Sequence, residues 1–287
     1  MRALVLTVLA GPLALARRTP ARAGLLVFLI ILLTAVTQIG GLVLWFCVPA
    51  CARLNRRLGD RGPALRSSAC LGLFVAAYLV VSFATVPLAG AFGRAPLDCG
   101  LTGAATYGPR TILTCLLNRH YATLLARQAL QKVSVELSAD FKGSKVAYLD
   151  AGFPFFDWFP MFPHISHGDG RKIDLALVHM DYAATPSPIG YWGFVQPRPG
   201  DPQPCNGREG WLRWDMAWLR PLLPEIELDE RSTTELLRRL VASPSVRRIL
   251  IEPHLEVWLG LDHPKLRFQG CRAARHDDHI HVEFAEK

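Results

Sequence analysis

The first 93 residues contain no lysine and only one acidic residue, Asp60. They hold nine arginines, so this segment carries the entire formal net charge of +8, and residues 94–287 balance to zero. A protein that follows a phosphate backbone needs a basic stripe on its folded part, and the balanced segment has no such excess. The charge distribution therefore excludes nucleic acid as the expected partner.

Charged residues are also nearly absent from two long stretches, residues 24–50 and 69–92. Each exceeds the ~20 residues needed to cross a bilayer, so both are predicted to be transmembrane helices. The short connection between them is rich in arginine, which places it in the cytoplasm by the positive-inside rule. We therefore expect a protein of the bacterial cytoplasmic (inner) membrane, with the domain after residue 93 on the periplasmic or outer side. The arginines are Arg53, Arg56, Arg57, Arg61 and Arg66.

The extreme N-terminus fits this topology less well. Residues 3–16 are apolar but short, and with Arg2 and Ala14-Leu15-Ala16 they look like a signal peptide with a small-residue cleavage site. The alternative is an interfacial or re-entrant segment. Cleavage would leave Arg17, Arg18 and Arg22 outside, against the positive-inside rule.

No two cysteines have CxxC spacing, so a cysteine zinc knuckle is not expected. The segment after residue 93 has four cysteines, an even number that could form two disulfides in an oxidising compartment. Three pairings are possible, and we expect Cys99–Cys115 and Cys205–Cys271.

The predicted fold class is α+β, a small antiparallel sheet with flanking helices after two transmembrane helices. We divide the chain into a membrane region (1–93), a linker with a helix start (94–117) and a folded domain (118–287). Apolar periodicity predicts a helix over about 110–134, and Ser232 to Glu235 is a capping box for a helix to about 242. Strands are expected at 145–150, 172–179, 246–252 and 279–284.

Residues 184–210 are rich in Pro and Gly and are expected to run over the surface. Trp211, Trp214 and Trp218 follow at i, i+3 and i+7, one face of a helix. Core packing is the favoured interpretation of this face, ahead of a platform for stacking a ligand.

Five of the nine histidines lie in two short clusters, which end in Asp174 and in His279-Ile280-His281. Side chains at i and i+2 of a strand share a face, so His279 and His281 point one way while Ile280 and Val282 face the core. On the upstream strand, Asp174 shares a face with Ala176 and Val178. If the two strands are neighbours, His167, Asp174 and one of the two strand histidines could hold zinc with a fourth position open for water. The other imidazole would act as general base or steady an oxyanion.

These residues also resemble a known family. His-x-Ser-His-x-x-Gly-x-x-x-Asp (164–174) and His-Asp-x-His-x-His-Val (276–282) look like the motifs of the penicillin-insensitive murein endopeptidases, in the lysostaphin and D-Ala-D-Ala metallopeptidase group. Tyr148 to Pro154 resembles the segment before the first motif. The resemblance covers about 118–284 and not the membrane anchor. It implies His167, Asp174 and His281 as zinc ligands, His279 as the catalytic histidine, and His164 and His276 as residues beside the ligands or substrate.

Several other residues have two interpretations. Glu252 and His254 would share a strand face and could line the groove, with Glu252 an alternative base, or could lie on an exposed edge strand. Asp277 and Asp278 could orient an imidazole, although a solvated turn is favoured. His120, His179 and His263 are expected to be structural.

The sequence thus predicts a membrane-anchored zinc metallopeptidase that hydrolyses an amide bond in peptidoglycan peptides or cross-links. One alternative is a carboxypeptidase that removes terminal D-Ala. The other is a non-catalytic metal-binding or scaffold protein of the cell envelope.

Overall fold

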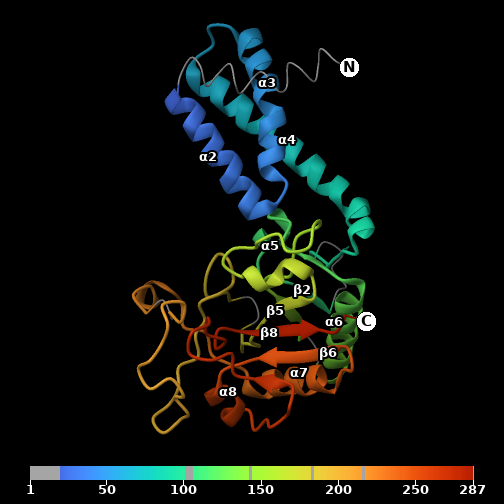
Figure 1. Cartoon of the computed structure of the whole chain (residues 1–287), viewed down its shortest axis with the longest axis vertical. Coiled ribbons are helices and arrows are strands. Elements are labelled where there is room, and N and C mark those ends of the chain that lie inside the picture. Colours follow the sequence, from blue (N-terminus) through green and yellow to red (C-terminus); the bar gives the residue numbers. More distant parts are fainter. Residues whose placement is uncertain (1–19, 101–105, 142–143, 182–183, 215–216, 287) are drawn as a thin grey trace. The chain divides into compact units, whose positions relative to one another are not determined.

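The structure, a computed structural model, describes residues 20–100, 106–141, 144–181, 184–214 and 217–286 (Figure 1). The chain divides into two compact units, residues 1–91 with 159–165, and residues 92–158 with 166–287. The predicted signal peptide at 1–16 lies outside the described residues.

The first unit is helical and consists of α2 (Pro20–Thr37), α3 (Gly40–Leu58) and α4 (Pro63–Ala89), followed by the 3-10 turn η1 (Gly90–Phe92). Two helical segments, Pro20–Thr37 and Pro63–Phe92, are long and apolar enough to cross a membrane. The expectation of one continuous helix over 24–50 is wrong, because α2 ends and α3 begins inside that run.

The break between α2 and α3 has a local cause. Gln38 has a φ of 66°, which reverses the chain, and the Thr37 hydroxyl accepts a hydrogen bond from the Gly40 amide at 2.8 Å. A Cβ on Gly41 would lie 2.2 Å from the Ile30 carbonyl oxygen of α2. Glycine at this position therefore allows the close helix approach that small residues provide in membrane hairpins.

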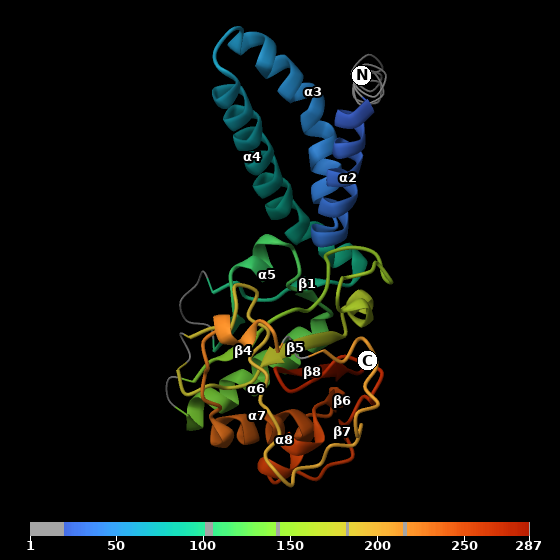
Figure 2. The ribbon, with the colours of Figure 1, turned by 90° about the vertical axis from the view of Figure 1, so that its left-hand side faces the viewer.

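The three helices form an up-and-down arrangement, side by side in both ribbon views (Figures 1 and 2). Because short connections join α2 to α3 and α3 to α4, the start of α2 lies at the same end as the α3–α4 connection. The described arginines of this unit gather at that end: Arg22, Arg53, Arg56, Arg57, Arg61 and Arg66.

The second unit is built on a six-stranded sheet in the order β2-β4-β5-β8-β6-β7. The strands are β2 (Tyr107–Pro109), β4 (Val146–Tyr148), β5 (Lys172–Ala176), β6 (Val246–Leu250), β7 (Leu266–Arg267) and β8 (His279–Phe284). The three inner pairings are antiparallel, whereas β2–β4 and β6–β7 are parallel. The prediction of an α+β unit is confirmed, and its sheet is mixed rather than wholly antiparallel. β1 (Ala95–Pro96) and β3 (Tyr121–Ala122) form a separate two-stranded sheet.

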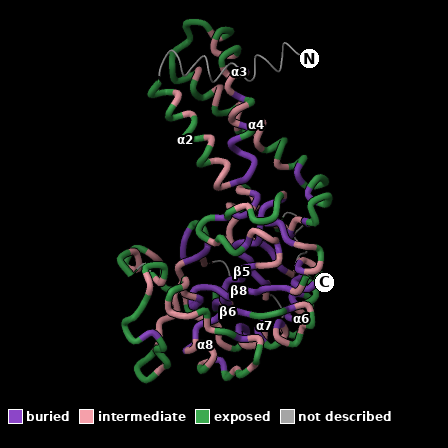
Figure 3. The backbone as a smooth tube through the Cα atoms, in the orientation of Figure 1, coloured by how far each residue is buried: buried purple, intermediate pink, exposed green. Residues whose placement is uncertain are grey.

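One face of the sheet is covered by α6 (Leu124–Asp140) and α7 (Glu230–Ala242). Ile173 and Leu175 of β5, with Ile280 and Val282 of β8, point into this core and are fully buried, as strand alternation predicts. The buried segments run through β5, β8 and β6 in Figure 3. The opposite face is left for polar side chains.

Several predicted elements are corrected. The single helix over 110–134 is replaced by α5 (Leu113–Leu116), β3 and α6, and α6 is capped by Thr123, which accepts from the Ala126 amide. The cap of α7 is Asp229, not Ser232, because the Asp229 side chain accepts from the Ser232 amide at 2.9 Å. The expected strand through Glu252 and His254 ends at Leu250, and α8 (Pro253–Trp258) follows.

The tryptophan helix is also wrong. Among the described residues of 211–218 there is no helix, and the three rings are exposed: Trp211 by 87%, Trp214 by 61% and Trp218 by 73%. Core packing is therefore wrong for these side chains.

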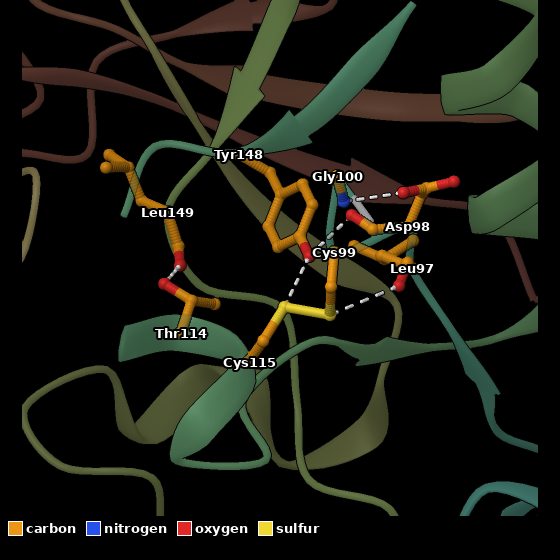
Figure 4. The surroundings of a disulfide bond; sticks show 8 residues. All are labelled: Leu97, Asp98, Cys99, Gly100, Thr114, Cys115, Tyr148 and Leu149. Carbon is orange, nitrogen blue, oxygen red and sulfur yellow. Dashed lines mark hydrogen bonds between the residues drawn. A yellow bond between two sulfur atoms is a disulfide. The ribbon is translucent and has the colours of Figure 1, made fainter. Parts of the chain in front are cut away.

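Both expected disulfides are present, Cys99–Cys115 and Cys205–Cys271. The first fastens α5 to the segment after β1, and the Tyr148 hydroxyl of β4 lies 3.3 Å from Cys115 Sγ while it donates to the Asp98 carbonyl at 3.0 Å (Figure 4). Although Cys99 and Cys115 lie close to His120, their sulfurs are used in the disulfide and offer no thiolate to a metal.

Candidate metal centre

The strand register creates the site. β5 and β8 are antiparallel neighbours, with Asp174 opposite His281 and Ala176 opposite His279. Since the apolar side chains of both strands face the α6–α7 core, these polar side chains emerge together on the other face. His167 comes from the 3-10 turn η2 (Ile165–Asp169) just before β5.

Three donor atoms converge at this point. Asp174 Oδ1 lies 2.8 Å from His281 Nδ1 and 3.2 Å from His167 Nε2, and the two ring nitrogens are 3.2 Å apart. All three side chains are almost completely buried. Ligands at zinc–ligand distances of 2.0–2.1 Å in a tetrahedron are separated by about 3.3 Å, so the observed triangle is close to the size a zinc ion requires.

Hydrogen bonds outside the triangle fix the tautomer of His167. Its Nδ1 lies 2.7 Å from the Ala151 carbonyl oxygen, an acceptor, so Nδ1 carries the proton and Nε2 presents a lone pair to the cluster. Burial lowers the pKa of His281 to about 4, which keeps this imidazole neutral. Neutral imidazoles and one carboxylate are the protonation states in which these side chains bind a divalent metal.

Asp174 is held from its other oxygen by Tyr191, which no sequence pattern singles out. The Tyr191 hydroxyl lies 2.8 Å from Asp174 Oδ2 and 3.1 Å from Asp150 Oδ2. Arg119 pairs with Asp150 at 2.8 Å and balances its charge. Burial, with these two carboxylates, raises the pKa of Tyr191 far above its usual range, so it stays a neutral phenol and a donor. This network leaves Asp174 Oδ1 directed at the histidines.

His279 stands beside the triangle and is oriented by its neighbour. Its Nδ1 lies 2.5 Å from Asp278 Oδ1, and its Nε2 lies 3.8 Å from Asp174 Oδ1. Asp278 Oδ2 accepts a hydrogen bond from the Trp192 amide at 3.0 Å. The favoured expectation of a solvated turn is therefore wrong for Asp278, which is buried and holds the imidazole. It is also wrong for Asp277, which is fully buried and paired with Arg275.

The flanking histidines of the two motifs are placed differently. His164 belongs to the segment 159–165, which is grouped with the helical unit. The His276 ring lies 4.9 Å from the His279 ring and 5.7 Å from the His281 ring, measured between centroids.

Glu252 and His254 do not share a strand face. Glu252 is buried, forms an ion pair with Arg213 at 2.6 Å and accepts from the His276 amide at 3.1 Å, so it fastens the segment that carries the second motif. His254 lies in α8, with Nε2 2.8 Å from the Val195 carbonyl oxygen and its ring against Trp258. Neither an exposed edge strand nor a shared groove wall describes this pair.

The donor set fits a metal ion for a further reason. With the Nδ1 proton of His167 donated to Ala151, the proton that lies between the three converging atoms is the one on His281 Nδ1. That proton can be donated to Asp174 Oδ1 or to His167 Nε2, but not to both at once. A cation at the centre would instead attract a lone pair from each of the three ligand atoms. No family model matches the chain, and comparison with curated proteins finds no match either.

Proposed function

We propose that this chain is a membrane-anchored, zinc-dependent peptidase that hydrolyses an amide bond in peptidoglycan peptides or cross-links, as the resemblance to murein endopeptidases implies. The observation that carries the proposal is the triangle of His167, Asp174 and His281 with the oriented imidazole of His279 beside it. Three protein ligands with a fourth position left for water or substrate are typical of catalytic zinc sites.

His167 Nε2, Asp174 Oδ1 and His281 Nδ1 would hold the ion. When bound, zinc supplies Lewis-acid polarisation of the scissile carbonyl and acidifies a water molecule. His279 Nε2 accepts the proton of the attacking water and delivers it to the leaving amine nitrogen, since its Nδ1–H is committed to Asp278. Asp278 stabilises the imidazolium formed between these two transfers, and Tyr191 keeps Asp174 in the ligand position.

Support for the cellular location comes from the helical unit. The described arginines gather at one end, which the positive-inside rule assigns to the cytoplasm. We infer that the peptidase unit lies on the outer side of the cytoplasmic membrane, where disulfides form and peptidoglycan is found.

The test uses the zinc-loaded full chain in detergent with purified peptidoglycan, and products are identified by mass spectrometry. Release of peptides that disappears in Asp174→Ala and His281→Ala, but persists in the control His263→Ala, is the expected result. His263 is a suitable control because it lies outside both motifs and its Nδ1 accepts from the Lys265 amide. Absence of cleavage with zinc and every other divalent metal would refute the enzyme, and cleavage by His281→Ala would refute the ligand set.

A second candidate, a non-catalytic metal site, is favoured by one observation, the His276 ring that lies 5.7 Å from the ring of the ligand His281, measured between centroids. A fourth protein ligand would close the open position that catalysis needs. Full zinc content with no hydrolysis in the chain, together with hydrolysis gained in His276→Ala, would support this candidate.

A further inference from the structure

The loop Phe155–Trp158 presents aromatic rings to the outside. Phe156 is 60% and Trp158 84% exposed, and both have positive φ, 42° and 67°, which non-glycine residues adopt rarely. Two contacts stabilise this loop conformation: the Trp158 amide donates to the Gly168 carbonyl at 3.0 Å, and Asp157 pairs with Arg94. The fold therefore stabilises an uncommon backbone conformation that exposes two large apolar side chains.

One of these rings, Phe156, contacts the last residue of a candidate span. Phe92 is the last residue of the segment Pro63–Phe92, and its ring lies 5.0 Å from that of Phe155 and 5.4 Å from that of Phe156. Phe92 is itself 44% exposed. Aromatic side chains gather where a membrane helix leaves the hydrocarbon, because their rings are stable at the headgroup level.

The same loop is connected to the metal centre through Arg94, two residues after the span. Arg94 is buried, pairs with Asp157 and donates to the Gly168 carbonyl at 3.3 Å. A Cβ on Gly170, which has a φ of 66°, would lie 2.6 Å from Arg94 Nε, so glycine is needed there for this contact. Gly168 follows His167 directly in the chain. The end of the span and a metal ligand are therefore linked by a few short contacts.

Those contacts limit the distance between the end of the candidate span at Phe92 and the metal ligand His167. Phe156 touches Phe92, Trp158 is two residues further on, and its amide bonds to the residue after His167. With Cα atoms 3.8 Å apart along the chain, the path from the Phe92 ring to His167 is on the order of 20 Å.

We propose that the loop Phe155–Trp158 lies in the interfacial layer of the bilayer that α4 crosses, and that the metal centre therefore acts on peptides attached to membrane lipids. The choice of a peptide substrate rests on the proposed function, whereas the membrane contact of the loop does not. A lipid surface is favoured over a protein partner because the aromatic cluster is continuous with the end of an apolar helix.

The membrane contact is tested with the full chain in nanodiscs that contain either ordinary phosphatidylcholine or its acyl-chain-brominated form, which quenches nearby tryptophans. The chain has seven tryptophans, so the contribution of one is the fluorescence lost on its replacement by Phe. The contribution of Trp158, obtained from Trp158→Phe, should be strongly quenched in the brominated lipid. The contribution of the matched exposed control Trp211, obtained from Trp211→Phe, should not be quenched. Equal, weak quenching of both would overturn the proposal and point to a protein partner for the loop.

The substrate inference is tested with zinc-loaded Trp158→Asp and Trp211→Asp. Cleavage of a peptide coupled to a lipid in the same nanodisc should fall roughly tenfold in Trp158→Asp, because the centre is no longer held at the surface. Cleavage of the same peptide in solution should not change, which also shows that the variant is folded. An equal loss on both substrates would refute the inference. Quenching of Trp158 without cleavage of any peptide would refute the proposed function and leave the membrane contact intact.

Discussion

Replacement of Asp278 by Asn should slow catalysis without removing the metal. Asp278 uses both carboxylate oxygens: one lies 2.5 Å from His279 Nδ1, and the other accepts from the Trp192 amide at 3.0 Å. Asparagine has one oxygen, so it can satisfy only one of these donors. The remaining donor then faces the amide NH₂ group, and His279 loses either its orientation or the tautomer in which Nε2 is unprotonated.

The size of the effect follows from the hydrogen bond that is lost. A buried hydrogen bond to a charged group contributes about 1.5–3 kcal/mol. The imidazolium formed during proton transfer depends on that carboxylate more than the neutral ring does, so most of the loss falls on the transition state. At 1.36 kcal/mol for each factor of ten, kcat should fall by about ten- to a hundredfold.

The assay compares initial rates of peptide release from peptidoglycan by the zinc-loaded chain and the variant, with zinc content measured by atomic emission. Asp277→Asn is a matched control, because burial already raises the pKa of Asp277 to about 7 and its carboxyl pairs with Arg275. Full zinc content with a reduced rate is expected for Asp278→Asn alone. Unchanged kcat in Asp278→Asn, or loss of zinc from it, would refute the reasoning.

Three further predictions address the network, the disulfide and acid stability. Tyr191→Phe removes the donor to Asp174 and should weaken zinc binding about ten- to a hundredfold in a chelator competition; unchanged affinity would show that the phenol does not hold the ligand. Replacing Cys205 and Cys271 by Ser opens a loop with a sequence separation of 66 and should lower the free energy of unfolding by about 4 kcal/mol in a urea titration. Burial lowers the pKa of His120 to about 4, so the unfolded state binds a proton more readily as pH falls below about 6.5, and stability declines from there towards pH 4. Between pH 8 and pH 5 this residue alone should cost about 2 kcal/mol, a difference that His120→Gln should remove if the cause is correct.

Strand alternation explains why much of the candidate site could be predicted. The side chains of β8 alternate between core and cluster, and the apolar members identify which face is inward. The pairing of Asp174 with His281 then needs only that β5 and β8 be neighbours in one register. The register of β5 and β8 is fixed by the alternation of apolar and polar side chains along each strand. A shift by one residue would turn the polar side chains of the cluster into the core.

The parts that could not be predicted depend on tertiary contacts. Tyr191 lies in a Pro/Gly-rich segment without periodicity, and only the folded chain brings its hydroxyl to Asp174. Asp278 looks like a solvated turn residue because its hydrogen-bond partner Trp192 is 86 residues away in the sequence. The break at Gln38 was hidden because hydropathy averages over a window, whereas the reversal depends on one positive φ and on close packing at Gly41.

The break between α2 and α3 also changes the position of Arg22 relative to the arginine-rich connection. With one span over 24–50, Arg22 and an arginine-rich connection would lie on opposite sides of the membrane. As a hairpin, α2 and α3 return the chain to its starting end, so Arg22 and Arg61 lie at the same end of the helical unit, as the proposed topology requires under the positive-inside rule. On the proposed topology the hairpin adds either two crossings or none. The side on which residues 92–287 emerge then depends on α4 alone, which has Arg66 near its start, whether the α2–α3 hairpin crosses the bilayer fully or only enters it.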